Sequence, residues 1–401
     1  MTGRLPLEGV RVLDLTTFLS GPSATQLLGD LGAEIVKVES FAGDSSRAIP
    51  GHYVGDDSAY YLANNRNKLS LSVDLKDPCG VDIVRRLIAE SDVVFENFRP
   101  GVCSRLGLGP NELTSAHPSL IWVSISGFGQ DGPLRDRPAY DMIVQALSGV
   151  MSLTGHEDAP AARLGIPAGD VVAGLYAVIG TLAALHARDT GEGGRIVNVS
   201  MLDGQLAMLS YQAVYAAISG SAPGRQGARH DSIPTYRSFT GGDGREFVVT
   251  ANTPRMWENM CTAMGLPDLL DDPRFFDGAR RLENKDALWE ILEARFAETP
   301  ADVWVQKLVE ANVPVAPIRD VVEALSDART AGNDSLVEIA NDSGSFENVA
   351  TPIRFSDTPD APRRYPPRLG EHTRTILLDR LRFDSDTFDK LVDRKVVQVA
   401  G

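Results

Sequence analysis

The chain has 401 residues, of which 43% are hydrophobic and 23% charged, so it has the composition of a globular protein and exceeds what one hydrophobic core usually supports. Its formal net charge of −15 argues against nucleic acid or a membrane surface as a partner, because long-range repulsion opposes both. The three cysteines have no metal-binding spacing and the N-terminus does not resemble a signal peptide, so we expect a cytoplasmic protein without disulfides or a metal.

Short β-branched runs alternate with helical patterns in the first half, which predicts a parallel α/β sheet. The expected strands are residues 9–16, 34–39, 69–73, 92–95, 120–126 and 195–199. A helix over 23–32 completes a βαβ unit at the start of the chain. The run from 170 to 186 has no charge after its first residue, which predicts a helix buried on most sides.

A Gly-, Ser- and Pro-rich segment at 219–234 indicates a domain boundary. Short helical patterns follow it, whereas the proline-rich tail at 350–381 must begin extended and is expected to return to the first domain. We therefore expect an α/β fold with a large domain in residues 1–218, a smaller α+β domain in 225–330, and a return of 331–401 that completes the large domain.

The turn after the first strand contains Gly21 but lacks the GxGxxG pattern, so the sequence does not support NAD binding. Polar and cationic residues do flank two other expected strands. Ligands bind at the carboxyl ends of parallel strands, so such clusters gain weight there, although each cluster taken alone is more typical of a solvated strand end. These residues are Arg66, Asn67 and Lys68 before one strand, and Asn97, Phe98 and Arg105 after another.

Two further features have both a structural and a functional interpretation. Gly127, Gly129 and Gly132 follow a strand end and allow positive φ, as a structural loop or a loop closing over substrate would need. Asp170 starts the apolar helix, so it is either a helix cap or an ionised carboxylate nucleophile with small neighbours that leave room for a ligand.

The motifs LDLTxxxSGP, NRNKLSLSVDLK, ENFRPGV, SISGFGQDGPLRDRPAYD, the Asp170 helix, NVPVAPIRDV and PPRLGEHT together resemble, in sequence and order, the class III CoA-transferases (CaiB/BaiF-like), from about residue 6 to 381. The resemblance implies a Rossmann-like large domain and an interlaced homodimer. It also implies coenzyme A, as acyl-CoA, and a carboxylic acid as substrates.

The resemblance implies that Asp170 is the nucleophile that passes CoA from a donor, with succinyl-CoA one candidate, to an acceptor acid through an anhydride and an aspartyl-CoA thioester. Asp141 corresponds to an acidic neighbour of that nucleophile, and Ser20 is a candidate for stabilising oxyanions. Arg66, Asn67, Lys68, Asn97, Phe98 and Arg105 fall on segments similar to the CoA-binding surface.

The chain departs from relatives within that superfamily. Leu19 and Ser40 replace a Gln and an Arg of formyl-CoA transferases, which makes formate and oxalate doubtful substrates. Tyr140 stands where α-methylacyl-CoA racemases place a His, and a phenol, with an ordinary pKa of about 10, is a poor base at pH 7. Transfer is therefore favoured over the alternative of a racemase, and a CoA-binding protein without catalysis is the third hypothesis.

Overall fold

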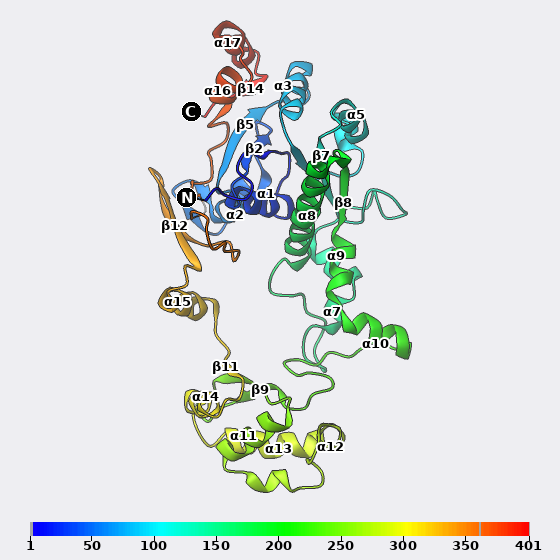
Figure 1. The fold of residues 1–401 in the computed structure, drawn as a ribbon, viewed down its shortest axis with the longest axis vertical. Coiled ribbons are helices and arrows are strands. Elements are labelled where there is room, and N and C mark those ends of the chain that lie inside the picture. The colour runs from blue at the N-terminus through cyan, green and yellow to red at the C-terminus, as the bar shows by residue number, and fades with distance from the viewer. Residues whose placement is uncertain (1–2, 361, 401) are drawn as a thin grey trace. The chain divides into compact units, whose positions relative to one another are not determined.

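The computed structural model describes residues 3–360 and 362–400, which divide into two compact units. Unit 1 comprises residues up to Met151, Arg163–Ser221 and Gly332–Gly401, and unit 2 comprises Ser152–Ala162 and Ala222–Ala331. The residues after 331 thus return to the same unit as the start of the chain (Figure 1).

Unit 1 is built on a seven-stranded sheet in the order β14-β5-β2-β1-β6-β7-β8. The strands are β1 (Arg11–Asp14), β2 (Glu34–Glu39), β5 (Lys68–Val73), β6 (Val93–Glu96), β7 (Ile121–Ser126), β8 (Ile196–Ser200) and β14 (Val397–Gln398). All neighbours are parallel except β14, which pairs antiparallel with β5. The chain runs outward from β1 in one direction through β2 and β5, and then from β6 in the other. The adjacent ends of β1 and β6 therefore form a topological switch point, where α/β sheets bind ligands.

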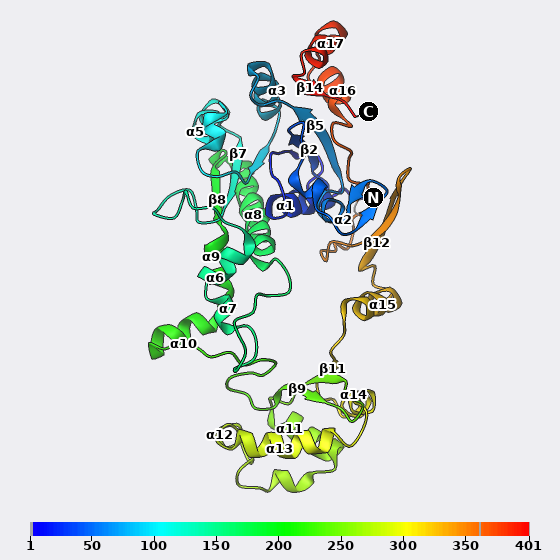
Figure 2. The same ribbon diagram turned by 180° about the vertical axis from the view of Figure 1, so that it is seen from behind.

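Helices cover both faces of this sheet, because its strands are apolar on both sides. One face packs on α1 (Ser20–Asp30) and α8 (Ala168–Ala187). The other packs on α3 (Pro78–Ala89), on α17 (Ser385–Asp393) and on the π-helical turn η4 (Ile376–Arg380), as the two opposite views allow the reader to follow (Figures 1 and 2).

Shorter elements complete unit 1. The helices are η1 (Ser45–Ala48), α2 (Ala59–Asn64), α4 (Val102–Arg105), α5 (Pro110–Ala116), α6 (Asp141–Leu147), η2 (Arg188–Glu192), α9 (Met201–Met208), α10 (Tyr211–Ser219) and α16 (Thr373–Thr375). The short helix α7 (Val150–Leu153) begins in unit 1 and ends in unit 2. The strands are β3 (Tyr53–Val54), β4 (Asp57–Ser58), β12 (Leu336–Asn341) and β13 (Gly344–Val349), which form two separate hairpins.

Unit 2 has its own apolar core, formed by a small antiparallel sheet and the helices packed on it. Its strands are β9 (Tyr236–Thr240), β10 (Glu246–Thr250) and β11 (Val315–Pro317). Its helices are α11 (Pro254–Met264), η3 (Pro267–Leu270), α12 (Gly278–Glu283), α13 (Lys285–Phe296), α14 (Ala301–Glu310) and α15 (Val321–Ala331).

The prediction that the apolar helix is buried on most sides is wrong for one of its faces. Ala173, Ala177 and Val178 of α8 pack on the sheet, but Leu175 is 48% and Ile179 60% exposed. By length and composition the run Ala168–Glu192 is apolar enough to cross a membrane, yet half of its apolar window is buried inside unit 1, as in a core helix.

Candidate active site

A cavity of about 250 Å³ lies at the switch point of the sheet and contains the Asp170 side chain. Its walls come from the loop after β1, the segment after β6, the loop after β7 and the start of α8. Of the predicted residues, the structure brings Ser20, Asn97, Phe98 and Tyr140 to this cavity together with Asp170.

Asp170 is the third residue of α8, and Pro167 is the residue that precedes the helix as its cap. The interpretation of Asp170 as the capping residue is therefore wrong. Burial raises the pKa of Asp170 to about 6, the charge of Asp141 acts in the same direction, and a hydrogen bond from Ser20 opposes both. The carboxylate is thus mostly ionised at neutral pH and more basic than an exposed aspartate, which suits a nucleophile.

Asp141 does not line the cavity but contacts the backbone of Gly169, the residue before Asp170. Its Oδ1 accepts a hydrogen bond from the Gly169 N–H at 2.7 Å, and its Oδ2 accepts one from Gln145 Nε2 at 2.7 Å. Gln145 is fully buried. Asp141 therefore fixes the backbone on which Asp170 stands, and it acts on Asp170 as a positioning residue.

The glycines beside Asp170 serve close packing, which corrects the expectation that they leave room for a ligand. A Cβ on Gly169 would lie 2.9 Å from Asp141 Oδ1. A Cβ on Gly174 would lie 2.7 Å from the carbonyl oxygen of Ser20, so this glycine lets α8 approach the start of α1. The two small residues bring Asp141 and Ser20 within reach of the nucleophile.

Asn97 anchors the loop that leads into α1, whose first residue is Ser20. Its Oδ1 accepts the Thr17 N–H at 2.9 Å and its Nδ2 donates to the Thr17 carbonyl at 2.8 Å. The next residue of that loop, Phe18, has a φ of 65°, a strained conformation for a bulky side chain. Phe18 packs edge-on against Tyr140, whose side chain is 67% exposed.

A buried network of charged side chains binds the backbone of this strained loop. No sequence motif had indicated this network. Lys37 Nζ donates to the Thr16 carbonyl at 2.7 Å and pairs with Asp44 at 2.9 Å, and Asp44 in turn accepts the Phe18 N–H at 3.0 Å. Burial alone would raise the pKa of Asp14, but the charges of Lys68 and Lys37 hold it well below its ordinary value.

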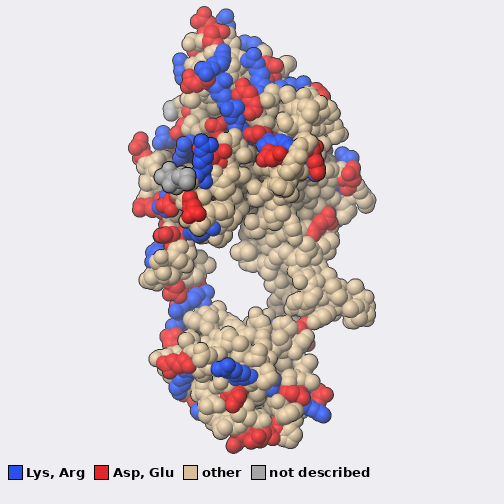
Figure 3. Space-filling model, in the orientation of Figure 1, with Lys and Arg blue, Asp and Glu red and all other residues tan. Residues whose placement is uncertain are grey.

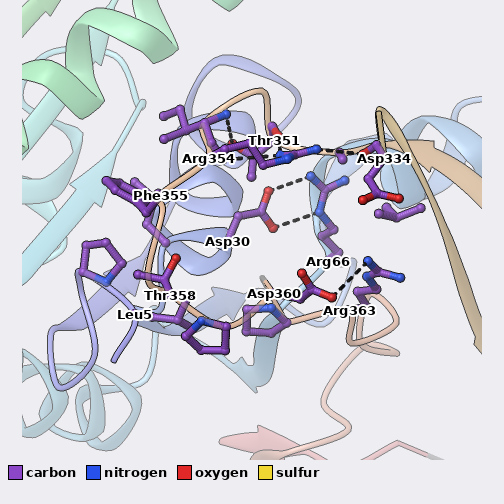
Figure 4. A pocket seen from close by; sticks show the side chains of 17 residues that line it. Leu5, Asp30, Arg66, Asp334, Thr351, Arg354, Phe355, Thr358, Asp360 and Arg363 are labelled. Carbon is purple, nitrogen blue, oxygen red and sulfur yellow. Dashed lines mark hydrogen bonds and ion pairs between the residues drawn. The ribbon is translucent and has the colours of Figure 1, made fainter. Parts of the chain in front are cut away.

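The turn of Arg66, Asn67 and Lys68 does not reach the cavity. Arg66 forms a two-pronged ion pair with Asp30 beside a separate cavity of about 150 Å³ (Figure 4). Asn67 Nδ2 also donates to Asp30, at 2.7 Å, and Lys68 Nζ pairs with Asp14 at 3.1 Å. All three side chains are buried, so their polar groups are already committed inside the protein and their assignment to CoA binding gains no support.

Arg105 also lies outside the cavity of Asp170. It lines a surface cavity of about 630 Å³ together with Leu75, Lys76 and Arg85. Arg85 is already paired with Glu112 at 2.6 Å, and Asp82 also lines this cavity, so Lys76 and Arg105 are the cations there that suit an anionic group of a ligand.

Three arginines in the wall of the Asp170 cavity were missed as site residues in the sequence: Arg99, Arg135 and Arg137. Arg99 belongs to the cationic cluster of ENFRPGV that the sequence indicates after a strand, but it was not assigned to the site. Arg135 and Arg137 belong to PLRDRPAY and were not singled out. Among the loop glycines, Gly129 and Gly132 have the expected positive φ, at 85° and 89°, and Gly127 reaches the cavity wall.

The model of CoA-transferase family III matches residues 7–373. A succinyl-CoA:glutarate CoA-transferase of Mus musculus is 38% identical over 98% of this chain and 90% of its own length, and an acetyl-CoA:oxalate CoA-transferase of Acetobacter aceti is 40% identical over 91% and 93%. The crystal structure of a CaiB/BaiF family protein from Brucella suis matches 94% of this chain and all of its own, with a TM-score of 0.84 at 34% identity. The chain therefore belongs to CoA-transferase family III and is a CoA-transferase.

Proposed function

We propose that this enzyme moves CoA between two carboxylic acids through covalent intermediates on Asp170, and that dicarboxylic acids are among its substrates. The single observation that carries the mechanism is the Asp170 carboxylate, made more basic by burial, in a cavity at the switch point of the sheet. Succinyl-CoA is the proposed donor, because succinyl-CoA or succinate appears in the names of two relatives, the succinyl-CoA:glutarate CoA-transferase of Mus musculus and a succinate–glutarate CoA-transferase of Agrobacterium fabrum.

In the first half-reaction an Asp170 oxygen attacks the thioester carbon of the donor, and the C–S bond breaks to release CoA thiolate. The thiolate then attacks the aspartyl carbon of the resulting anhydride, which frees the donor acid and leaves an aspartyl-CoA thioester. The acceptor carboxylate attacks the aspartyl carbon of that thioester, and the C–S bond breaks to release CoA thiolate and leave an anhydride between Asp170 and the acceptor. The thiolate then attacks the acceptor acyl carbon of this anhydride, which forms the new acyl-CoA and releases the Asp170 carboxylate. Protons and charges balance, so the cycle needs no external acid or base.

The site supports each of these steps. The confined cavity keeps thiolate and anhydride together, and such positioning is worth up to about 7–11 kcal/mol of the barrier. Ser20 O–H, already bonded to Asp170, and backbone N–H groups of the loop that begins at Gly127 are the proposed donors to the oxyanions. Arg105 and Lys76, in the surface cavity, are the proposed partners of the CoA phosphates.

We also propose that the sheet of unit 1 is Rossmann-like and that the enzyme is an interlaced homodimer. Apolar side chains of α8 to α10 are exposed in the single chain, among them Ile179 at 60% and Ile218 at 82%. The surface over these helices carries few charged side chains (Figure 3). A second copy of the chain would bury this face.

The test is a screen of succinyl-CoA against a panel of carboxylic acids in deuterated buffer, read by mass spectrometry. We expect CoA to appear on dicarboxylic acids of four or five carbons, with no deuterium at the α-carbon of any acyl-CoA. Rapid α-deuteration without transfer to any acid would instead support the racemase alternative. In a racemase, Tyr140 would have to act as the second base.

A further inference from the structure

The charges in the Asp170 cavity are unbalanced. Asp170 is the one carboxylate among the described residues that line it, whereas Arg99, Arg135 and Arg137 supply three guanidinium groups. In a chain of net charge −15, such a local excess of cations favours an anionic occupant. Asp170 and the carboxylate that reacts with it balance two of these three positive charges, which leaves one positive charge for a second negative group of the occupant.

Two of these arginines have no competing partner. Arg135 Nε lies 3.6 Å from Asp136 Oδ1, but neither Arg99 nor Arg137 forms an ion pair with any carboxylate that the structure describes. The Arg137 guanidinium lies over the Phe128 ring at 5.9 Å, which orients it without neutralising it. Both arginines are thus able to bind an incoming carboxylate.

The positions of the two residues place them on one side of the cavity. Arg99 follows β6 and Arg137 belongs to the loop after β7, and β6 and β7 are neighbours in the sheet. Asp170 instead enters from α8, which covers a face of that sheet. Asp170 and the two arginines therefore reach the same cavity from different elements.

The volume of the Asp170 cavity limits the size of the ligand that it holds. At about 250 Å³ it is smaller than the roughly 300–1,000 Å³ typical of pockets for drug-sized ligands, so its volume suits a short acid better than the nucleotide part of CoA. A short acid with one carboxylate at Asp170 and a second at its far end matches the charge and the volume of the cavity.

We propose that Arg99 and Arg137 bind the second, non-reacting carboxylate of a short dicarboxylic acid and so determine the choice of dicarboxylic over monocarboxylic substrates. Each guanidinium offers paired N–H donors to the distal carboxylate, a geometry that gives both affinity and orientation. This inference rests on the proposed transfer through Asp170 and adds to it the residues that select the acid.

The test compares glutarate with its monoamide, glutaramate, which has the same length but only one carboxylate. In this two-stage cycle kcat/KM for the acceptor reports only the second half-reaction, so the donor does not affect the comparison. The variants are Arg99→Gln, Arg137→Gln and, as a matched control, Arg280→Gln, an exposed arginine of unit 2 that lines none of the cavities described above.

We expect each cavity variant to lower kcat/KM for glutarate by roughly 10- to 100-fold, as for loss of a hydrogen bond to a charged group, and to leave glutaramate unchanged. The control should match the wild type with both acids. Equal losses with both acids, or no loss with glutarate, would overturn the assignment.

A binding measurement separates this inference from the mechanism. Calorimetry should show glutarate bound more weakly by Arg137→Gln than by the wild-type enzyme, whether or not transfer occurs. If the wild type transfers CoA to no acid, the proposed function fails, and the calorimetric comparison still decides the arginine site: equal affinities would refute it.

Discussion

Replacing Asp170 by Asn should stabilise the protein while abolishing transfer. The pKa of this carboxyl rises from an ordinary 3.8 to about 6 in the folded protein, which corresponds to about 3 kcal/mol at about 1.4 kcal/mol for each pKa unit. Between those pH values the folded state binds the proton more tightly than the unfolded chain. The free energy of unfolding therefore falls as the pH rises through this window, and it stays lower above about pH 6.

Asparagine keeps the shape and an oxygen for the Ser20 hydrogen bond but carries no charge. Above pH 7, Asp170→Asn should therefore raise the free energy of unfolding by up to about 3 kcal/mol, and the loss of stability between pH 4 and pH 6 should shrink. Urea unfolding at pH 5 and pH 7.5 measures both effects. Had Asp170 been only a favourable acid at a helix N-terminus, the change would instead cost about 0.3–1 kcal/mol.

Asp203 offers a matched control, because it is the third residue of α9 as Asp170 is of α8, but it is exposed. Asp203→Asn should be neutral or slightly destabilising. The reasoning would be refuted if Asp170→Asn lowered the stability at pH 7.5, or if its gain were no larger than that of Asp203→Asn.

Three other predictions concern the surroundings of the nucleophile and the assembly. Asp141→Asn removes the like charge that helps to raise the Asp170 pKa, so the acid limb of the pH profile of kcat should move to lower pH; an unmoved limb would rule out the electrostatic role. Arg105→Ala should raise KM for the CoA ester by more than it lowers kcat. Calorimetry showing unchanged CoA affinity would exclude this surface cavity as the binding site of the CoA phosphates. Light scattering at nanomolar concentration should still show a dimer, since an interlaced pair cannot yield a folded monomer on dilution; a stable monomer would contradict interlacing.

The order of the elements could be predicted from the sequence because hydrophobic periodicity is a local signal. The expected strands at 34–39 and 69–73 match β2 and β5 within one residue. The apolar composition of α8 predicted burial, but composition does not say which face meets the sheet, so its exposed residues Leu175 and Ile179 were not foreseen. Which face of α8 is buried depends on tertiary packing and on the contacts of the chain with any partner.

The candidate site was predictable where a resemblance identified one residue, and not where a contact joins distant segments. Asp170 and Asn97 were named from motifs and lie at the same cavity. From the sequence, Arg66 was predicted to be free to bind a ligand. Its partner Asp30 lies 36 positions away in the chain, so the residues next to Arg66 do not indicate the pair. The convergence of Arg99 and Arg137 likewise depends on the pairing of β6 with β7.

Trapping of the covalent intermediate tests the central claim most directly. The enzyme would be incubated with succinyl-CoA alone, treated with borohydride to reduce an aspartyl thioester to the alcohol, and digested for peptide mapping by mass spectrometry. The account predicts a reduced side chain at Asp170 in the wild type, and none in Asp170→Asn. An unmodified Asp170 peptide from enzyme that is transferring CoA, together with normal activity of Asp170→Asn, would contradict it.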